Sequence, residues 1–410
     1  MLTRALKSQI AQNIIALSFV QVVNFLLPLI LIPYLLKTLG TQGWGKIAYA
    51  QFLLQYFVVV VTYGYQWSAV NRIAPVRHNI NQVNRMFSSY WISQWFLLLI
   101  SLIILIIAIA LFIDDKLQKL LLNMGFLSVV GTVIFPVWMM QALEKLKEMA
   151  IVQFIVQIFC FVLIYNFVND KDDIVLAMFL QSINNIISGL ICIFLLYRQG
   201  YKLVKITSAD IYEALKDGFD LFTSQIWISL YTNTIPIVLG YTASASAVAT
   251  YAVADKVQKA VRFVLNPIGR ALFPRISYLI KGNKKQANKI LKLSLLFTTL
   301  ITFMGGFVLF LFPSFFVKLL GGEELSYAKE VIRIFSIMPM LVGLSGTLAI
   351  QGLIPLGKQK ALNIIWFLSA FITLILVYPV CKYYGVVGAA SLAVSIELFT
   401  VLSMFYFIKR

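Results

Sequence analysis

The chain has 410 residues, of which 60% are hydrophobic and 12% are charged, and its formal net charge at pH 7 is +18. This composition is typical of a helical protein that crosses a membrane many times, and it excludes an ordinary arrangement of soluble domains. The positive charge does not indicate nucleic-acid binding, because the Lys and Arg residues occupy short gaps between apolar runs and form no long basic block.

The cysteine and histidine content limits the possible functions further. The three cysteines, Cys160, Cys192 and Cys381, lie far apart, and the single histidine is His78. Such spacing provides neither the ligand set of a zinc site nor the framework of a disulfide-rich fold. We therefore expect no metal and no cofactor.

Twelve apolar segments are long enough for membrane-spanning helices, each of which needs about 20 residues. The segments are residues 10–36, 46–68, 86–112, 119–140, 150–168, 174–197, 219–241, 247–273, 290–313, 329–353, 361–381 and 386–408. We therefore predict an all-α polytopic membrane protein.

The distribution of Lys and Arg predicts the orientation of these helices. With a cytoplasmic N-terminus, the cytoplasmic segments hold 21 of these residues and the opposite face holds 9, leaving out the four in the eighth segment. Since cytoplasmic loops of membrane proteins carry the excess of positive charge, both termini should be cytoplasmic.

The longest cytoplasmic gap, residues 198–218, lies at the midpoint of the chain. Its sequence ITSADIYEALKDG predicts a short amphipathic helix that begins at a Ser208 cap. Six predicted spans precede this gap and six follow it. We therefore expect two six-helix lobes, residues 1–205 and 206–410, around a central cavity.

The eighth predicted span is unusual because of its charged side chains, which are Asp255, Lys256, Lys259, Arg262 and Arg270. A charge near the centre of a bilayer costs roughly 2.5 to 3.5 kcal/mol. At about 100° per residue, Asp255, Lys259 and Arg262 fall on one face of a helix. One interpretation is structural, with Asp255 and Lys259 paired and the other cations directed to lipid headgroups. The interpretation that we favour is a water-filled cavity that holds an anionic substrate.

Several short motifs resemble a known family. They are LG-x-x-x-WG at residues 39–45, WMMQALEK at residues 138–145, and TNTIPIVLGY, TYAVADKVQ and ALFPRIS within residues 232–277. Together with twelve spans in two halves, they resemble the polysaccharide biosynthesis flippases of the multidrug/oligosaccharidyl-lipid/polysaccharide exporter superfamily. Trp44 stands where the family usually has a smaller aromatic residue, Ala142 where glycine is common, and Asn233 where aspartate is frequent.

The resemblance implies a function in surface polysaccharide synthesis. It implies a flippase in the bacterial inner membrane that moves a polyprenyl-pyrophosphate-linked oligosaccharide from the inner to the outer leaflet by alternating access. The product would be O-antigen of lipopolysaccharide or another surface polysaccharide, with a polymerase or ligase acting next. The alternative within the superfamily is a cation-coupled multidrug antiporter.

An enzyme is a weaker interpretation. The D-x-D sequence at Asp170 and Asp172 is found in membrane glycosyltransferases that use polyprenyl donors, and repeat-unit polymerases also act on such lipids. These enzymes generally need a large external loop to build the site, whereas the gap here has about six residues. We therefore expect that the chain is not an enzyme.

Uncharged polar side chains add to the candidate cavity. The first span carries Asn24, the second carries Gln51 and Gln55, and the seventh carries Asn233. Amides in a cavity would bind sugar hydroxyls while Lys and Arg bind pyrophosphate, although amides also join helices in membrane bundles. The predicted substrate-binding residues are Asn24, Gln51, Gln55, Asn233, Asp255, Lys256, Lys259, Arg262 and Arg270.

Glu397 is the only acid deep in the last predicted span. A carboxylate at that depth either pairs with a cation from another helix or binds a coupling proton or Na⁺. Both roles remain open from the sequence, and Glu397 is the candidate for the coupling ion.

The charge asymmetry makes the predicted topology testable. Reporter fusions after Lys205, Lys285 and Lys358 should report the cytoplasm, and fusions near Gly43, Asp173 and Gly322 should report the outside. The activities of a cytoplasmic and an external reporter at each position provide the measurement. A consistent inversion at all six positions would contradict the topology.

Overall fold

The structure is a computed structural model. It describes residues 2–262, 276, 279, 284–321, 324–325 and 327–409, with backbone alone for residues 2–28, 284, 287 and 409. The chain forms two compact units. Unit 1 comprises Met1–Leu27 and Ala50–Ile226, and unit 2 comprises Pro28–Tyr49 and Trp227–Arg410. One segment of the N-terminal half therefore packs with the C-terminal half.

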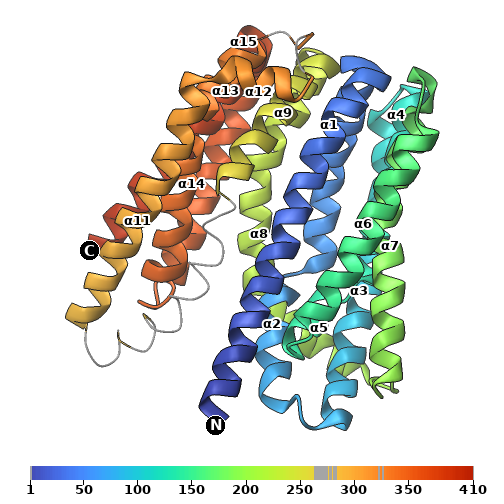
Figure 1. The fold of residues 1–410 in the computed structure, drawn as a ribbon, viewed down its shortest axis with the longest axis vertical. Coiled ribbons are helices and arrows are strands. Elements are labelled where there is room, and N and C mark those ends of the chain that lie inside the picture. Colours follow the sequence, from blue (N-terminus) through green and yellow to red (C-terminus); the bar gives the residue numbers. More distant parts are fainter. Residues whose placement is uncertain are drawn as a thin grey trace. The chain divides into compact units, whose positions relative to one another are not determined.

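All of the regular secondary structure in the described residues of unit 1 is helical. Its elements are part of α1 (Leu2–Thr62), α2 (Tyr65–Ile73), η1 (Ala74–Val76), α3 (Ile80–Phe112), α4 (Lys116–Ile134), α5 (Val137–Ala142), α6 (Leu146–Phe167), η2 (Lys171–Asp173), α7 (Ile174–Arg198) and the start of α8 (Ser208–Thr242). Helices α4, α6 and α7 lie side by side (Figure 1). Asn79 and Asp115 cap α3 and α4 by accepting hydrogen bonds from the backbone N–H groups of Gln82 and Leu117.

The regular secondary structure in the described residues of unit 2 is also helical. Its elements are the Pro28–Tyr49 segment of α1, the remainder of α8, α9 (Ala245–Arg262), α11 (Lys284–Leu311), α12 (Pro313–Leu319), α13 (Ala328–Phe335), α14 (Met338–Thr347), η4 (Leu348–Leu353) and α15 (Gln359–Lys409). Helices α11, α14 and α15 run beside one another (Figure 1).

Apolar side chains lie on the outer surfaces of the helices as well as between them. In α3, only 22% of the most apolar stretch is buried inside the protein, and Leu111 and Phe112 are 70% and 79% exposed. A water-soluble protein would not expose so many large apolar side chains on one helix. The prediction of a polytopic all-α membrane protein is therefore confirmed.

Eight helical segments in the described residues are long and apolar enough to cross a membrane. Two of them, Leu29–Val76 and Gln359–Ile408, have 48 and 50 residues. Each is about twice the length that one crossing needs. Each also contains a glycine with non-helical backbone angles, Gly40 (φ 73°) in the first and Gly385 (φ 55°) in the second, where one long helix breaks into two. The first segment also includes α2 and η1, which follow α1. The exact number of twelve spans stays a prediction.

The linker helix differs from the sequence prediction in two details. The helix begins at Ser208, but it continues to Thr242 as a single helix instead of ending before the next span. Its capping interactions come from Thr207, whose backbone N–H donates to Asp210 Oδ2 at 2.9 Å while its hydroxyl oxygen accepts from the Asp210 N–H at 3.4 Å. Ser208 and Thr207 are both good capping residues, so sequence alone does not separate them.

Ion pairs attach this linker helix to unit 1. Arg85 pairs with Asp210 at 2.9 Å, and Arg72 pairs with Asp217 at 2.7 Å. The backbone N–H of Thr207, then its hydroxyl and the Arg85 guanidinium, hold the pKa of Asp210 below its usual value. Tyr90 also donates to Asp217 at 3.1 Å. The start of α8 is thereby joined to α2 and α3.

Gly189 in α7 packs closely against the backbone at Phe135, and this contact can be tested by mutation. A Cβ atom on Gly189 would lie 2.7 Å from the backbone nitrogen of Phe135, so Gly189→Ala should destabilise the protein by roughly 1 to 3 kcal/mol through overpacking. The matched control is Gly346→Ala in α14, where the new Cβ would meet nothing within 4 Å. Thermal unfolding of the purified proteins in detergent measures the difference. Equal unfolding midpoints for the two variants would contradict the packing described here.

Candidate functional site

The motif LG-x-x-x-WG has a structural explanation in unit 2. Gly40 adopts φ 73° and ψ 173°, a backbone conformation that separates the two helices of α1. Gly45 lies in close contact with the start of α9, because a Cβ atom there would lie 1.8 Å from the carbonyl oxygen of Ala245. Trp44 between them is 1% exposed. The motif therefore packs the Pro28–Tyr49 segment against the start of α9.

Trp44 contacts one of the charged residues of α9. The Lys256 Nζ atom lies 4.8 Å from the centroid of the Trp44 ring, a cation–π distance, and the Lys256 side chain is partly buried. Contacts of this kind contribute about 0.5 to 2 kcal/mol. The Trp44 indole nitrogen is buried and has no hydrogen-bond partner in the described part of the chain. The indole ring thus offsets the cost of placing Lys256 inside unit 2.

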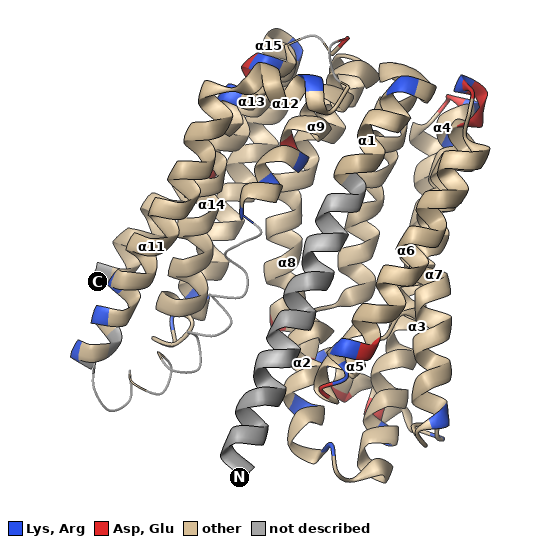
Figure 2. Ribbon diagram, in the orientation of Figure 1, with Lys and Arg blue, Asp and Glu red and all other residues tan. Residues whose placement is uncertain are grey.

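Asp255 is the acid of α9, and it has two partners on the same helix. Lys259 Nζ lies 2.5 Å from Asp255 Oδ2, and Gln258 Nε2 donates to Asp255 Oδ1 at 2.8 Å. The Lys259 side chain is 46% exposed and the Asp255 side chain 14% exposed. Lys259 therefore pairs with Asp255. This is the ion pair expected if the charges of this span have a structural role. Figure 2 shows that α9 carries both basic and acidic residues.

Arg262 is the last residue of α9 and differs from Lys259. Its side chain is partly buried, and its Nε atom is enclosed without a hydrogen-bond partner among the described residues. The opposite charges that act on it are Asp255, on its own helix, and Glu397, on α15. Arg262 therefore has donor capacity that the described residues leave unused.

Glu397 lies in a buried polar cluster and is 3% exposed. Ser345 Oγ of α14 donates to Glu397 Oε1 at 2.5 Å. Tyr231 of α8, itself 9% exposed, and Arg262 of α9 are the other polar groups that act on the carboxylate. Four helices of unit 2 therefore contribute to the surroundings of one acid.

Sequence reasoning missed Tyr231 and Ser345. Tyr231 precedes the TNTIPIVLGY motif by one residue, and its hydroxyl is a polar group in an apolar segment, which was an available signal. Ser345 lies in the sequence GLSGT of small residues, which predicts close helix packing and gives no sign of an acid nearby. Only the packing of α14 on α15 brings Ser345 to Glu397.

The uncharged candidates make local contacts. Asn233 Nδ2 donates to Ser229 Oγ, one turn earlier on α8, at 2.9 Å. Gln51 Nε2 donates to Gln181 Oε1 of α7 at 3.1 Å, which is a bond between helices, and Gln55 is exposed. Both glutamines belong to unit 1, whereas Asn233 and the described residues of α9 belong to unit 2.

Two other candidates lie beyond what the structure describes. Asn24 is in the part of α1 where only the backbone is described, and Arg270 lies outside the described residues. Within the described residues, no group of three or more His, Cys, Asp and Glu side chains is placed to hold a metal ion.

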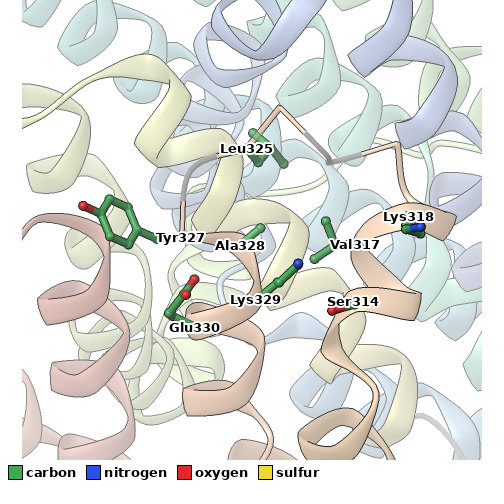
Figure 3. Close-up of a pocket in the computed structure, with 8 residues that line it drawn as sticks. All are labelled: Ser314, Val317, Lys318, Leu325, Tyr327, Ala328, Lys329 and Glu330. Atoms are coloured by element: carbon green, nitrogen blue, oxygen red, sulfur yellow. The ribbon is translucent and has the colours of Figure 1, made fainter.

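A cavity of about 410 Å³ lies elsewhere in unit 2 (Figure 3). It is lined by Ser314, Val317, Lys318, Leu325, Tyr327, Ala328, Lys329 and Glu330. Five of these residues are exposed, and they come from α12, α13 and the segment between them. Figure 3 shows the Lys329 and Glu330 side chains at this surface hollow. The cavity includes none of the predicted site residues, so we do not take it as the candidate site.

Two family profiles match the chain. The profile described as polysaccharide biosynthesis protein matches residues 10–280, and the profile described as MatE matches residues 221–380. A protein of Escherichia coli strain K12, provisionally named an O-antigen transporter, is 30% identical over 407 residues, which are 98% of this chain and 98% of that protein. A protein of Shigella dysenteriae with the same provisional name is 29% identical over 401 residues, which are 97% of this chain and 100% of that protein.

Solved structures share the fold at low sequence identity. An inward-facing multidrug resistance transporter of the MATE family and the MOP superfamily superposes with a TM-score of 0.71 at 12% identity, covering 96% of each chain. The lipid II flippase MurJ in an inward closed conformation gives a TM-score of 0.67 at 15% identity, covering 98% of this chain and 87% of MurJ.

Proposed function

The chain belongs to the family of polysaccharide biosynthesis proteins, and on this premise we propose that it is a flippase for a lipid-linked oligosaccharide. Its cargo is a polyprenyl-pyrophosphate-linked repeat unit of O-antigen or another surface polysaccharide. Transport runs from the inner to the outer leaflet of the bacterial cytoplasmic membrane. The provisional name of the E. coli relative and the fold shared with the lipid II flippase support this proposal.

The observation that carries the proposal is the unused donor capacity of Arg262. Asp255 already accepts hydrogen bonds from Lys259 and Gln258, whereas the enclosed Nε atom of Arg262 has no partner among the described residues. A guanidinium binds phosphate oxygens through charge-assisted hydrogen bonds, often two at a time. Pyrophosphate is therefore the class of anion that this side chain suits best.

Lys259 has the second role at this site. It holds Asp255 at 2.5 Å, but its side chain is 46% exposed and so accessible to an incoming anion. The positive charge of Lys259 also attracts a phosphate that approaches Arg262, because both cations lie on one face of α9. We assign the main contact to Arg262 and the supporting contact to Lys259. Lys256, Asp255, Asn233, Gln51, Gln55, Asn24 and Arg270 remain proposed members of the substrate site.

Alternating access requires helices that can move relative to one another. Gly40 and Gly385 divide two long helices, and Pro236 lies inside α8, where it frees a backbone carbonyl. We propose that two lobes, residues 1–205 and 206–410, change their relative position around the site and that both termini are cytoplasmic. Glu397 is the proposed coupling residue, and a polymerase or ligase acts on the exported unit.

A drug antiporter is the second candidate function. The MatE profile on residues 221–380 and the fold shared with a multidrug resistance transporter favour it. A lipophilic cation, however, would be repelled by Lys256, Lys259 and Arg262. Transport of a fluorescent cationic drug by reconstituted protein, with no transport of lipid-linked sugar, would favour the antiporter.

An enzyme is not supported. None of the relatives and solved structures named above is described as an enzyme. The external D-x-D sequence forms a capped turn in which Asp173 Oδ2 accepts the backbone N–H groups of Asn169 and Asp170 at 2.9 and 3.0 Å. The carboxylates of Asp170 and Asp173 therefore cap this turn.

The assignment of Arg262 is tested in reconstituted vesicles. Arg262→Ala should lower the rate of lipid-linked oligosaccharide flipping at least tenfold, because one charge-assisted contact to phosphate contributes about 1.5 to 3 kcal/mol. Arg262→Lys should retain partial activity, since the charge remains without the two-pronged geometry. Lys259→Ala should have a smaller effect than Arg262→Ala.

The matched control is Lys360→Ala, which removes one positive charge at an exposed position of α15 in the same unit. Its flipping rate should equal that of the wild-type protein. If Arg262→Ala and Lys259→Ala both flip the lipid at the wild-type rate, the charges of α9 are structural and the phosphate is held elsewhere.

A further inference from the structure

Two acidic side chains fasten the start of α8 to unit 1. Asp217 accepts hydrogen bonds from Arg72 of α2 at 2.7 Å and from Tyr90 of α3 at 3.1 Å. Asp210 Oδ1 accepts from Arg85 Nε of α3 at 3.0 Å, and Arg85 Nη2 lies 2.9 Å from the same oxygen. The Asp217 and Asp210 side chains are only 22% and 15% exposed. Linked charges of this kind hold better than one isolated surface pair, and we call these five residues the clasp.

Close packing reinforces the clasp. A Cβ atom on Gly218 would lie 2.5 Å from the carbonyl oxygen of Tyr63, so the α8 backbone touches the turn between α1 and α2. The rings of Tyr63 and Phe222 are stacked, with their centroids 4.5 Å apart. The start of α8 therefore cannot leave α2 without breaking polar and apolar contacts together.

The segment between α7 and α8 is held along α3 as well. The side chain of Asn84 accepts from the Lys202 N–H at 3.1 Å, and the hydroxyl oxygen of Ser88 accepts from the Val204 N–H at 2.9 Å. Asn84 and Ser88 are 7% and 0% exposed. This segment is therefore bound to unit 1 and does not form a free tether between the two halves of the chain.

Beyond the clasp, α8 continues into the other unit. It is one helix of 35 residues, whereas the boundary between the units falls after Ile226. Its later part carries Asn233, a proposed substrate contact, and Pro236 comes only after that residue. Since an α-helix rises about 1.5 Å per residue, Asn233 lies roughly 24 Å along the helix from Asp217. A continuous helix thus connects the clasp to the candidate site.

We propose that Asp217 and Asp210 are positioning residues for transport. They fix the start of α8 to unit 1 throughout the transport cycle, so that a displacement of unit 1 is carried along this helix to Asn233 in unit 2. The inference rests on the proposed function and refines it, because the first moving lobe extends to Ile226 instead of ending at residue 205. The alternative is a gate, in which the same ion pairs break and re-form in every cycle.

The test replaces one ion pair of the clasp by a covalent link. In vesicles, full-length Arg72→Cys/Asp217→Cys should flip undecaprenyl pyrophosphate linked to one N-acetylglucosamine at least about fivefold more slowly than the wild type, with an unchanged Kd for undecaprenyl pyrophosphate. A short bifunctional maleimide that joins the two new thiols should restore the rate, because α8 is again fixed to α2. The native cysteines are buried and so protected from the reagent.

The matched control is Arg77→Cys/Glu144→Cys. This variant removes an ion pair of unit 1 that does not include α8. Its flipping rate should equal that of the wild-type protein both before and after treatment with the maleimide.

A second variant keeps the inference testable if the first does not fold. Two glycines inserted after Ile226 leave the clasp intact but weaken the helix between the clasp and Asn233. Flipping should again slow while the Kd stays unchanged. The same insertion after Ile113, in the loop between α3 and α4, should leave both quantities at the wild-type values.

Three outcomes would overturn the inference. They are wild-type flipping by Arg72→Cys/Asp217→Cys without the maleimide, loss of the remaining flipping after cross-linking, and wild-type flipping with the insertion after Ile226. Loss on cross-linking would identify the clasp as a gate. A failure of the proposed function is distinguishable from all three, because the wild-type protein itself would then neither bind nor flip these lipids.

Discussion

A charge inside an apolar helix bundle needs a partner, and the requirement is strictest along α9. Asp255 meets Lys259 at 2.5 Å, and Lys256 lies over the ring of Trp44 at 4.8 Å. Glu397 on α15 then supplies opposite charge for Arg262 at the end of the helix. Each charge thus has a different kind of compensation, and the compensation of Arg262 is the least complete. For this reason we propose Arg262 as the main contact for the substrate.

Close packing makes these charge contacts possible. Gly45 allows the Pro28–Tyr49 segment to approach the Ala245 carbonyl so closely that a Cβ atom would lie 1.8 Å from it. This approach brings the Trp44 ring to Lys256. A segment from the first helix is therefore part of the surroundings of α9 in unit 2.

The sequence predicted what depends on short distances along the chain. Hydrophobic length predicted a polytopic helical protein, and the 3.6-residue period predicted that Asp255 and Lys259 share a face, where they form an ion pair. Contacts between helices that are distant in the sequence could not be predicted in this way. Ser345 contacts Glu397 only through tertiary packing. The same is true of the contact between Trp44 and Lys256. The division of α1 between two units was also not predictable, since hydropathy assigns spans and not their neighbours.

The central claim is that the chain carries a lipid-linked sugar outward across the membrane. The most direct test is to deplete the protein from living cells and to determine in which leaflet the polyprenyl-pyrophosphate-linked repeat unit accumulates. The account predicts accumulation in the inner leaflet together with loss of surface polysaccharide. Normal delivery of the repeat unit to the outer leaflet in depleted cells that lack related flippases would contradict it.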